Sequence, residues 1–309
     1  MSPVALRGMG GIGKTTLAIA LGREKSVSEF FAGGVLWAEL GPRPKAYDLL
    51  KAWAVALGVD IPPGSDVPAC KRTLRSALSQ RKALLIIDDV WETAAGKHFL
   101  VGGPLCRTLF TTRESPVAHA LATQERTRHV DLLSPESALE LLSRLAPDAV
   151  ALDRGAAKRL CEKLEFLPLA LKLAGHMLAN ESGVPSRMRR LVADLLKQAD
   201  ARLNLLQPEG RLGLDEGAPV SLRAILSMSV ERLSEEERYR FAKLAVFGAE
   251  PTWWTLDAAE YVWACGREEA EETTAHLVQR GLIEKRGDRY WMHALLCDYA
   301  KELEECLAK

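Results

Sequence analysis

Hydrophobic positions in the first 130 residues alternate between short apolar runs and segments with helical spacing. Five apolar runs predict β-strands, at 4–6, 35–40, 83–88, 109–112 and 129–132. Three amphipathic segments between them predict helices, at 15–24, 46–57 and 67–79. The run at 83–87 is wholly apolar, which is typical of a strand buried on both faces. The alternation therefore predicts an α/β fold, with a parallel sheet that helices cover on both faces.

After residue 133 the strand signals stop and helical patterns follow. Ser134 is an expected N-cap, and Pro135 suits the first helical position. Helices are predicted at 135–146, 153–164, 167–180, 186–204, 221–231, 234–247, 256–264, 267–280 and 294–306. Glycine and proline interrupt the pattern at 205–219, and two short strands flank residues 286–288. We expect an α/β domain (1–133), a small helical domain (134–204), a linker (205–219) and a winged-helix domain (220–309).

Composition is that of a folded protein of two or more domains. The 309 residues are 48% hydrophobic and 27% charged, which argues against intrinsic disorder. No apolar run approaches the roughly 20 residues of a membrane-spanning helix, and the first residues do not resemble a signal peptide. The six cysteines form no C-x-x-C pair. They indicate reduced thiols, and a cytoplasmic protein is the expectation.

Residues 8–15, GMGGIGKT, match the pattern G-x-x-x-x-G-K-[ST] between a predicted strand and a predicted helix. Such a loop turns backbone N–H groups toward a phosphate, and the helix N-terminus adds partial positive charge. We expect Lys14 to bridge the β and γ phosphates, Thr15 to ligate Mg²⁺ and Thr16 to lie near the α phosphate. The expected nucleotide-binding residues of the loop are Gly8, Gly10, Gly11, Ile12, Gly13, Lys14, Thr15 and Thr16.

Polar residues follow two of the predicted strands at their carboxyl ends, where open α/β sheets bind ligands. Asp88 ends an apolar run, and a buried carboxylate there is costly unless it is paired or bound to a metal, so it is a second expected Mg²⁺ ligand. Asp89 is a candidate to orient or deprotonate an attacking water, or alternatively an ordinary loop aspartate. Arg113 is placed to contact a γ phosphate through a charge-assisted hydrogen bond. Together with Lys14, these three are the expected catalytic residues.

These motifs resemble the NB-ARC family of STAND-class P-loop signal-transduction ATPases. The resemblance is carried by GMGGIGKTT at 8–16, LIIDDVW at 85–91, FTTR at 110–113, EFLPLA at 165–170 and MHA at 292–294, in family order. It implies that ADP, ATP and Mg²⁺ bind, that Pro168 lies against adenine and that His293 contacts the β phosphate of ADP. It also implies an α/β domain, a helical domain and a winged helix that close over ADP.

Three departures from the family pattern bear on these implications. Only two residues precede Pro3, where family members carry a segment that helps to hold adenine. Phe166 stands where the family has glycine, and Ala294 replaces the aspartate after the motif histidine. Because alanine cannot cap a helix through its side chain, we expect a less firmly locked closed state.

The hypothesis that follows is a molecular switch with slow ATP hydrolysis. ADP would hold a closed monomer, and ATP with Mg²⁺ would let the winged helix rotate about the 205–219 linker and the protein form homo-oligomers. Separate sensor or effector domains or proteins are possible partners. The alternatives are a DNA-binding regulator that uses the winged helix, and an ordinary P-loop kinase or ATPase.

The formal net charge of zero hides a separation along the chain. Residues 1–130 hold 17 basic and 11 acidic side chains, and residues 131–204 hold 11 and 10. Residues 205–309 hold 13 basic and 20 acidic side chains. An acidic C-terminal part disfavours DNA binding through the winged helix, because it repels the phosphate backbone. The opposite charge of the first part favours closure, more weakly as salt rises.

Overall fold

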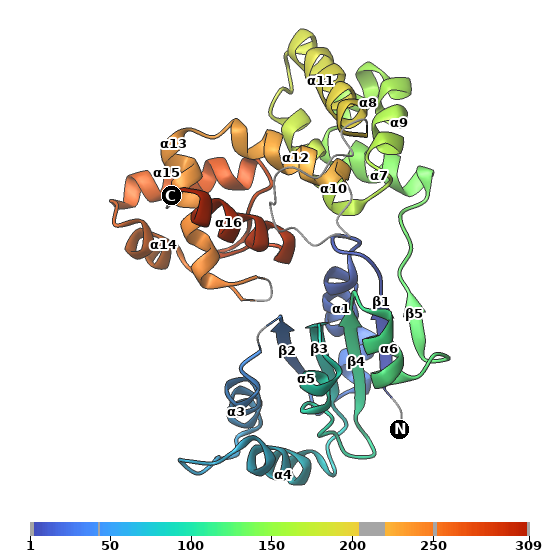
Figure 1. Cartoon of the computed structure of the whole chain (residues 1–309), viewed down its shortest axis with the longest axis vertical. Helices are drawn as coiled ribbons and strands as arrows, with labels where there is room; N and C mark the ends of the chain where they lie inside the picture. The colour runs from blue at the N-terminus through green and yellow to red at the C-terminus, as the bar shows by residue number, and fades with distance from the viewer. Residues whose placement is uncertain (1–2, 43, 204–219, 250–251, 308–309) are drawn as a thin grey trace. The chain divides into compact units, whose positions relative to one another are not determined.

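The structure of the chain is a computed structural model that describes residues 3–42, 44–203, 220–249 and 252–307 (Figure 1). The chain divides into two compact units, unit 1 (Met1–Asp131) and unit 2 (Leu132–Lys309). The predicted linker at 205–219 lies outside the described residues. Within the described part, no helix combines the length and the apolar character needed to cross a bilayer.

Unit 1 is built on a five-stranded parallel sheet, as the apolar runs predict. Its strands are β1 (Val4–Arg7), β2 (Val35–Gly41), β3 (Leu84–Val90), β4 (Arg107–Thr112) and β5 (Thr127–His129). Their spatial order is β2-β3-β4-β1-β5, and each neighbouring pair is parallel. The carboxyl ends of all five strands therefore meet at one edge of the sheet, where the loops after β1, β3 and β4 come together.

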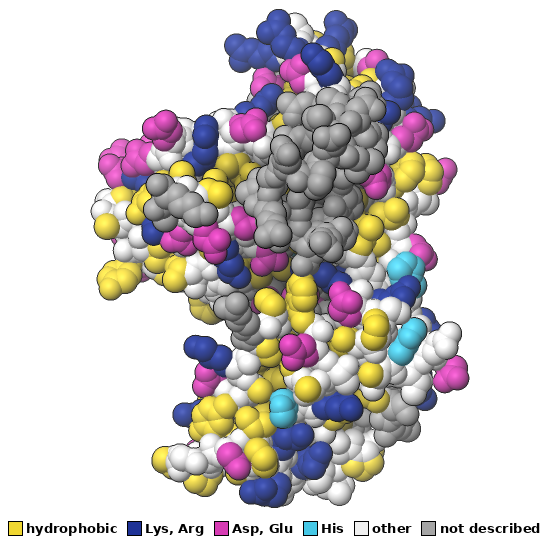
Figure 2. Space-filling model, viewed as in Figure 1, with side chains coloured by type: hydrophobic (Ala, Val, Ile, Leu, Met, Phe, Trp, Pro, Cys, Tyr) yellow, Lys and Arg dark blue, Asp and Glu magenta, His cyan; other side chains and the backbone are white. Residues whose placement is uncertain are grey.

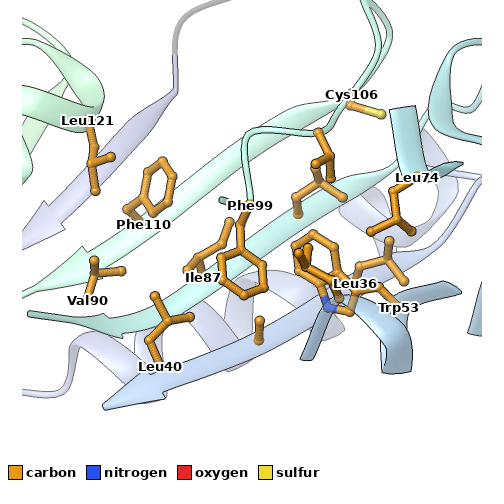
Figure 3. Packing of buried hydrophobic residues seen from close by; sticks show 14 of the residues in the cluster. Leu36, Leu40, Trp53, Leu74, Ile87, Val90, Phe99, Cys106, Phe110 and Leu121 are labelled. Carbon is orange, nitrogen blue, oxygen red and sulfur yellow. The ribbon is translucent and has the colours of Figure 1, made fainter. Parts of the chain in front are cut away.

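Helices cover both faces of this sheet. They are α1 (Lys14–Arg23), α2 (Lys25–Phe30), α3 (Ala46–Leu57), α4 (Val67–Leu78), α5 (Thr93–Lys97) and α6 (Ser115–Ala122). On one face, Ile86 and Leu109 pack with Ala18 of α1. The other face carries the larger core, in which Ile87, Phe110 and Phe99 lie among side chains of α3, α4 and α6 (Figure 3). Successive residues at 84–87 of β3 thus enter opposite cores, and this explains why all four are apolar.

The predicted strand at 129–132 is wrong. The strand is β5, Thr127–His129, and it pairs with β1. Thr127 is half-buried and Arg128 and His129 are exposed because β5 is an edge strand of the sheet, so its sequence lacks the apolar signal of the inner strands. Val130 still donates its N–H to the carbonyl of Arg7 (2.8 Å).

The short helices α2, α5 and α6 were not expected, since six, five and eight residues hold too little helical periodicity to be recognised. In unit 2 the same holds for α8, six residues at Pro147–Leu152. The helix predicted at 234–247 ends earlier as an α-helix, because its last four residues form a 3₁₀ turn at Leu244–Phe247.

Unit 2 is mainly helical. Its described elements are α7 (Pro135–Leu145), α8, α9 (Arg154–Lys163), α10 (Pro168–Ala179), α11 (Pro185–Leu203), α12 (Val220–Glu231), α13 (Glu235–Lys243), η1 (Leu244–Phe247), α14 (Leu256–Trp263), α15 (Arg267–Gln279), β6 (Glu284–Arg286), β7 (Arg289–Trp291) and α16 (Ala294–Leu307). Ser134 caps α7 as expected, accepting from the N–H of Ser137 (3.1 Å). The predicted hairpin is present as the antiparallel pair β6–β7. The subdivision of this unit into a helical and a winged-helix domain stays a prediction.

Candidate nucleotide-binding site

The loop between β1 and α1 is held close to the sheet. Gly8 donates its N–H to the carbonyl of Thr112 at the end of β4 (3.3 Å). A Cβ at Gly8 would lie 3.0 Å from the carbonyl oxygen of Val130, so any side chain there would have to displace the backbone of that residue slightly. Gly13, just before α1, has φ +100°, a conformation that glycine adopts at little cost. Helix α1 therefore begins directly after the loop, and its N-terminus favours a bound anion.

Lys14 is the first residue of α1, and its side chain lies under the loop. Only 7% of the residue is exposed, and its ammonium group donates to the carbonyls of Gly8 (2.8 Å) and Met9 (2.9 Å). Burial, reinforced by the charge of Arg113, lowers the pKa of Lys14 from 10.5 to about 8. Its positive charge is therefore concentrated at the loop and weakly solvated, as a phosphate-binding lysine requires.

Asp88 in β3 faces the start of α1. It is 1% exposed; Thr15 donates its hydroxyl to one carboxylate oxygen (2.9 Å), and Thr111 donates to the other. Burial raises the pKa of Asp88 from 3.8 to about 6, although both hydrogen bonds oppose the rise. A carboxylate and a hydroxyl side by side are the hard oxygen ligands that Mg²⁺ takes, so these residues fit the expected metal site.

Asp89 and Arg113 form a second pair next to Asp88. The Nε of Arg113 lies 3.6 Å from Oδ1 of Asp89, and both side chains are largely buried. Trp91 donates its indole N–H to Oδ2 of Asp89 (2.8 Å), and the guanidinium carbon of Arg113 lies 4.9 Å from the centre of the Trp91 ring. Asp89 has φ +49°, a left-handed backbone conformation that is uncommon for residues other than glycine.

Two residues of this network were missed in the sequence. Thr111 donates to Asp88 and accepts from the N–H of Asp89 (2.9 Å), so one fully buried hydroxyl joins the two acidic residues. Trp91 holds both Asp89 and Arg113. Thr111 stands inside the motif FTTR and Trp91 ends the motif LIIDDVW. Their positions beside the expected site residues were the only sign in the sequence that they belong to the site.

Replacement of Thr111 by valine is expected to lower the free energy of unfolding by about 2–4 kcal/mol. The shape of the side chain is kept, but the N–H of Asp89 and one oxygen of Asp88 lose a buried partner, each at about 1–3 kcal/mol. Urea denaturation measures the change. Thr108→Val, on the same strand and with no recorded side-chain hydrogen bond, is the matched control and should change stability by less than about 1 kcal/mol. An equal loss in both variants would contradict the assigned role of Thr111.

The other expected loop residues lie where the motif places them. Gly10, Gly11 and Ile12 form the turn between β1 and α1, with Ile12 buried, and Thr16 lies on an exposed position of α1.

Pro168 and His293 belong to unit 2. Pro168 is at the start of α10, after Glu165 and Phe166, which both have positive φ (53° and 54°). Glycine is the residue that adopts this conformation most readily, which explains why the family pattern has glycine where this chain has Phe166.

The N-terminus of α16 is capped by His293. Its Nδ1 accepts from the N–H of Leu295 (3.2 Å), and its carbonyl accepts from Leu296 and Cys297 (both 2.9 Å). The helix therefore has a cap although Ala294 supplies none, and the acceptor role of Nδ1 sets the orientation of the ring. The assigned contacts of Pro168 with adenine and of His293 with phosphate stay predictions.

Comparison with known proteins identifies relatives of this chain. Residues 1–151 match the family model described as NB-ARC domain. These residues of the chain belong to the NB-ARC family. A solved STAND protein with a tetratricopeptide repeat sensor, from Pyrococcus horikoshii, has a similar fold: its TM-score is 0.56 at 17% identity, over 98% of this chain and 40% of that one. This similarity shows a shared fold.

Two curated relatives align along almost the whole chain. Regulatory protein AfsR of Streptomyces griseus is 29% identical over 99% of this chain. Apoptotic protease-activating factor 1 of Homo sapiens is 26% identical over 97% of it. This chain spans only 30% and 24% of the lengths of these two proteins.

Proposed function

We propose that this NB-ARC core is a nucleotide-controlled switch that closes with ADP and, with ATP and Mg²⁺, opens and forms homo-oligomers. The observation that carries the proposal is the arrangement of Arg113. This arginine is held by Asp89 and Trp91 at the edge of the sheet that also carries Lys14 and Asp88. A cation at this place lies among the groups that would hold the phosphates, yet it already has a partner that a γ phosphate would have to replace.

Each residue of the site would have a different role toward the phosphates. The loop N–H groups and Lys14 would bind the β and γ phosphates, and Thr15 with Asp88 would hold Mg²⁺, which supplies charge neutralisation when bound. Asp89 would orient the attacking water. An additional γ phosphate favours transfer of Arg113 from Asp89 to the nucleotide, so ATP and ADP stabilise different positions of this side chain.

The conformational part of the proposal concerns unit 2. Pro168 would lie against adenine and His293 against the β phosphate of ADP, with the winged helix moving about residues 205–219. A shift from 1:99 to 99:1 needs about 5.5 kcal/mol of differential binding. A few charge-assisted hydrogen bonds at about 1.5–3 kcal/mol each supply this amount. Slow hydrolysis of ATP, Mg²⁺ dependence, homo-oligomers, separate sensor or effector partners and a cytoplasmic site of action are all parts of this proposal.

Arg113→Ala tests the switch. We expect the variant to bind ATP at least about tenfold more weakly and ADP within about twofold of the wild type, because only the γ phosphate would gain the guanidinium contact. Calorimetric titration of each nucleotide measures this. Arg72→Ala removes an exposed arginine of α4 and should change neither affinity. Equal losses for ADP and ATP would contradict the assigned sensing role.

The oligomeric state of the protein with each nucleotide distinguishes the proposed switch from an ordinary P-loop kinase or ATPase. Size-exclusion chromatography with light scattering should show a larger species with ATP and Mg²⁺ than with ADP. Rapid turnover by a chain that stays monomeric with both nucleotides would contradict the switch. A gel shift at low salt tests the DNA-binding alternative, and the excess of acidic residues at 205–309 predicts no shift.

A further inference from the structure

Unit 2 contains a polar hollow of about 500 Å³ that the motifs do not explain. Residues of four segments line it, from the end of α10, the start of α11, the end of α12 and the end of α15. The lining residues are Met177, Asn180, Glu181, Arg187, Arg232, His276, Gln279 and Arg280. Among them Met177 is the single apolar side chain, so the hollow is unsuited to an apolar ligand.

Three arginines converge on this hollow from separate parts of the chain. Arg187 comes from α11, Arg232 follows α12 and Arg280 follows α15. Glu181 is the one acidic residue in the lining, so the three arginines give the hollow net positive charge. This stands out because residues 205–309 are acidic overall, and acidic side chains gather over α13 and α15 on the face shown in Figure 2.

Arginines near helix C-termini commonly donate to the last carbonyls of the helix, and this structural use must be weighed first. Arg238, close by, shows it: its guanidinium donates to the carbonyls of Glu231 and Leu233 (both 3.3 Å). Within the described residues no hydrogen bond or ion pair is recorded for the guanidinium groups of Arg187, Arg232 and Arg280. Arg187 and Arg232 are exposed and Arg280 is half-buried, so their guanidinium groups are open to a ligand, and an anion would reduce the repulsion among these like charges.

We propose that this hollow, the arginine hollow, binds a small molecule that carries more than one phosphate group. Guanidinium groups match phosphate oxygens with paired hydrogen bonds, and three of them on separate elements suit several phosphates rather than one. Asn180, Gln279 and the ring of His276 add further hydrogen-bonding groups to the wall. His276 is itself oriented by Glu237, whose carboxylate lies 2.7 Å from its Nδ1. Because α10, α11, α12 and α15 all contribute, the bound molecule would join the helices before and after residues 204–219.

Inorganic pyrophosphate is the probe for a calorimetric titration at 150 mM salt, where weak surface attraction is screened. The titration uses the full chain in the Lys14→Ala background, so that binding at the P-loop and binding at the arginine hollow are distinguishable. We expect one pyrophosphate bound per chain in this background. Arg232→Gln with Arg280→Gln should weaken that binding at least tenfold. Loss of all pyrophosphate binding on Lys14→Ala alone would overturn the proposal and leave the proposed switch intact.

The matched control removes two arginines of the same unit that lie outside the hollow. Arg190→Gln with Arg286→Gln takes away the same charge from exposed positions of α11 and β6 and should change pyrophosphate binding by less than twofold. Equal weakening by both pairs would show non-specific attraction and overturn the proposal. The single variant Arg187→Gln, at an exposed position, guards against misfolding of the double variant and should weaken binding about threefold or more.

Discussion

Replacement of Lys14 by alanine is expected to lower the affinity for ADP and ATP at least a hundredfold. The ammonium group lies under the loop, where it donates to Gly8 and Met9, and it is the buried cation nearest to the expected phosphates. Hydrogen bonds to charged groups contribute about 1.5–3 kcal/mol each, and two of them correspond to roughly a hundredfold or more. Calorimetry with each nucleotide, in the presence of Mg²⁺, measures the loss.

The control for this experiment is Lys51→Ala, which removes an exposed lysine of α3 and should leave both affinities within about twofold. Thermal unfolding without nucleotide shows whether the variant retains its fold, because Lys14 also ties the loop to its own carbonyls. If a folded Lys14→Ala protein bound ADP as tightly as the wild type, the loop would not be the phosphate site.

Replacement of Asp88 by asparagine is expected to stabilise the nucleotide-free protein at neutral pH while it removes the Mg²⁺ dependence of nucleotide binding. Burial raises the pKa of Asp88 from 3.8 to about 6, so between these values the folded protein holds a proton that the unfolded chain has lost. The stability that the wild type derives from this proton is fully present below about pH 4 and is lost as the pH rises to about 6. At 1.36 kcal/mol per pKa unit, the cost at neutral pH is about 3 kcal/mol.

Denaturation with urea at pH 4 and pH 8, without nucleotide or metal, tests this prediction. The asparagine variant should be more stable than the wild type by about 3 kcal/mol at pH 8 and similar to it at pH 4. Asp60→Asn, at an exposed carboxyl of unit 1, should show no such pH-dependent difference. A difference that is the same at both pH values would argue against a buried, ionised Asp88. Nucleotide titrations with and without Mg²⁺ should agree for the Asp88 variant and differ for the wild type.

The sheet of unit 1 was predictable where burial on both faces leaves a wholly apolar run, as at residues 84–87 of β3. The edge strand β5 lacks this apolar pattern, and the strand was therefore predicted at 129–132, two residues too late. Side chains that act through neighbours distant in sequence were also missed. Thr111 reads as an ordinary strand threonine until the sheet places it beside Asp88 and Asp89.

The two positions at which this chain departs from the family motifs also show what the sequence reveals and what only the structure reveals. The sequence reveals that Phe166 and Ala294 depart from the pattern. Only the structure shows that Phe166 adopts the left-handed conformation suited to glycine, and that His293 caps α16 in place of the missing aspartate. Backbone conformation and helix capping depend on three-dimensional contacts, and the sequence does not specify these contacts directly.

The sequence alone establishes the class of chemistry, because a phosphate-binding loop is a contiguous stretch whose glycines, lysine and threonine act through local backbone geometry. It likewise indicates that Asp88 lies toward the carboxyl end of its strand, although it places the end of that strand at Asp88 and the structure extends β3 to Val90. The tertiary structure decides how strongly each group is charged and what it contacts. The raised pKa of Asp88, the lowered pKa of Lys14 and the pairing of Arg113 with Asp89 and Trp91 all follow from burial. The arginine hollow exists only because α10, α11, α12 and α15 meet, since its charges are far apart along the chain.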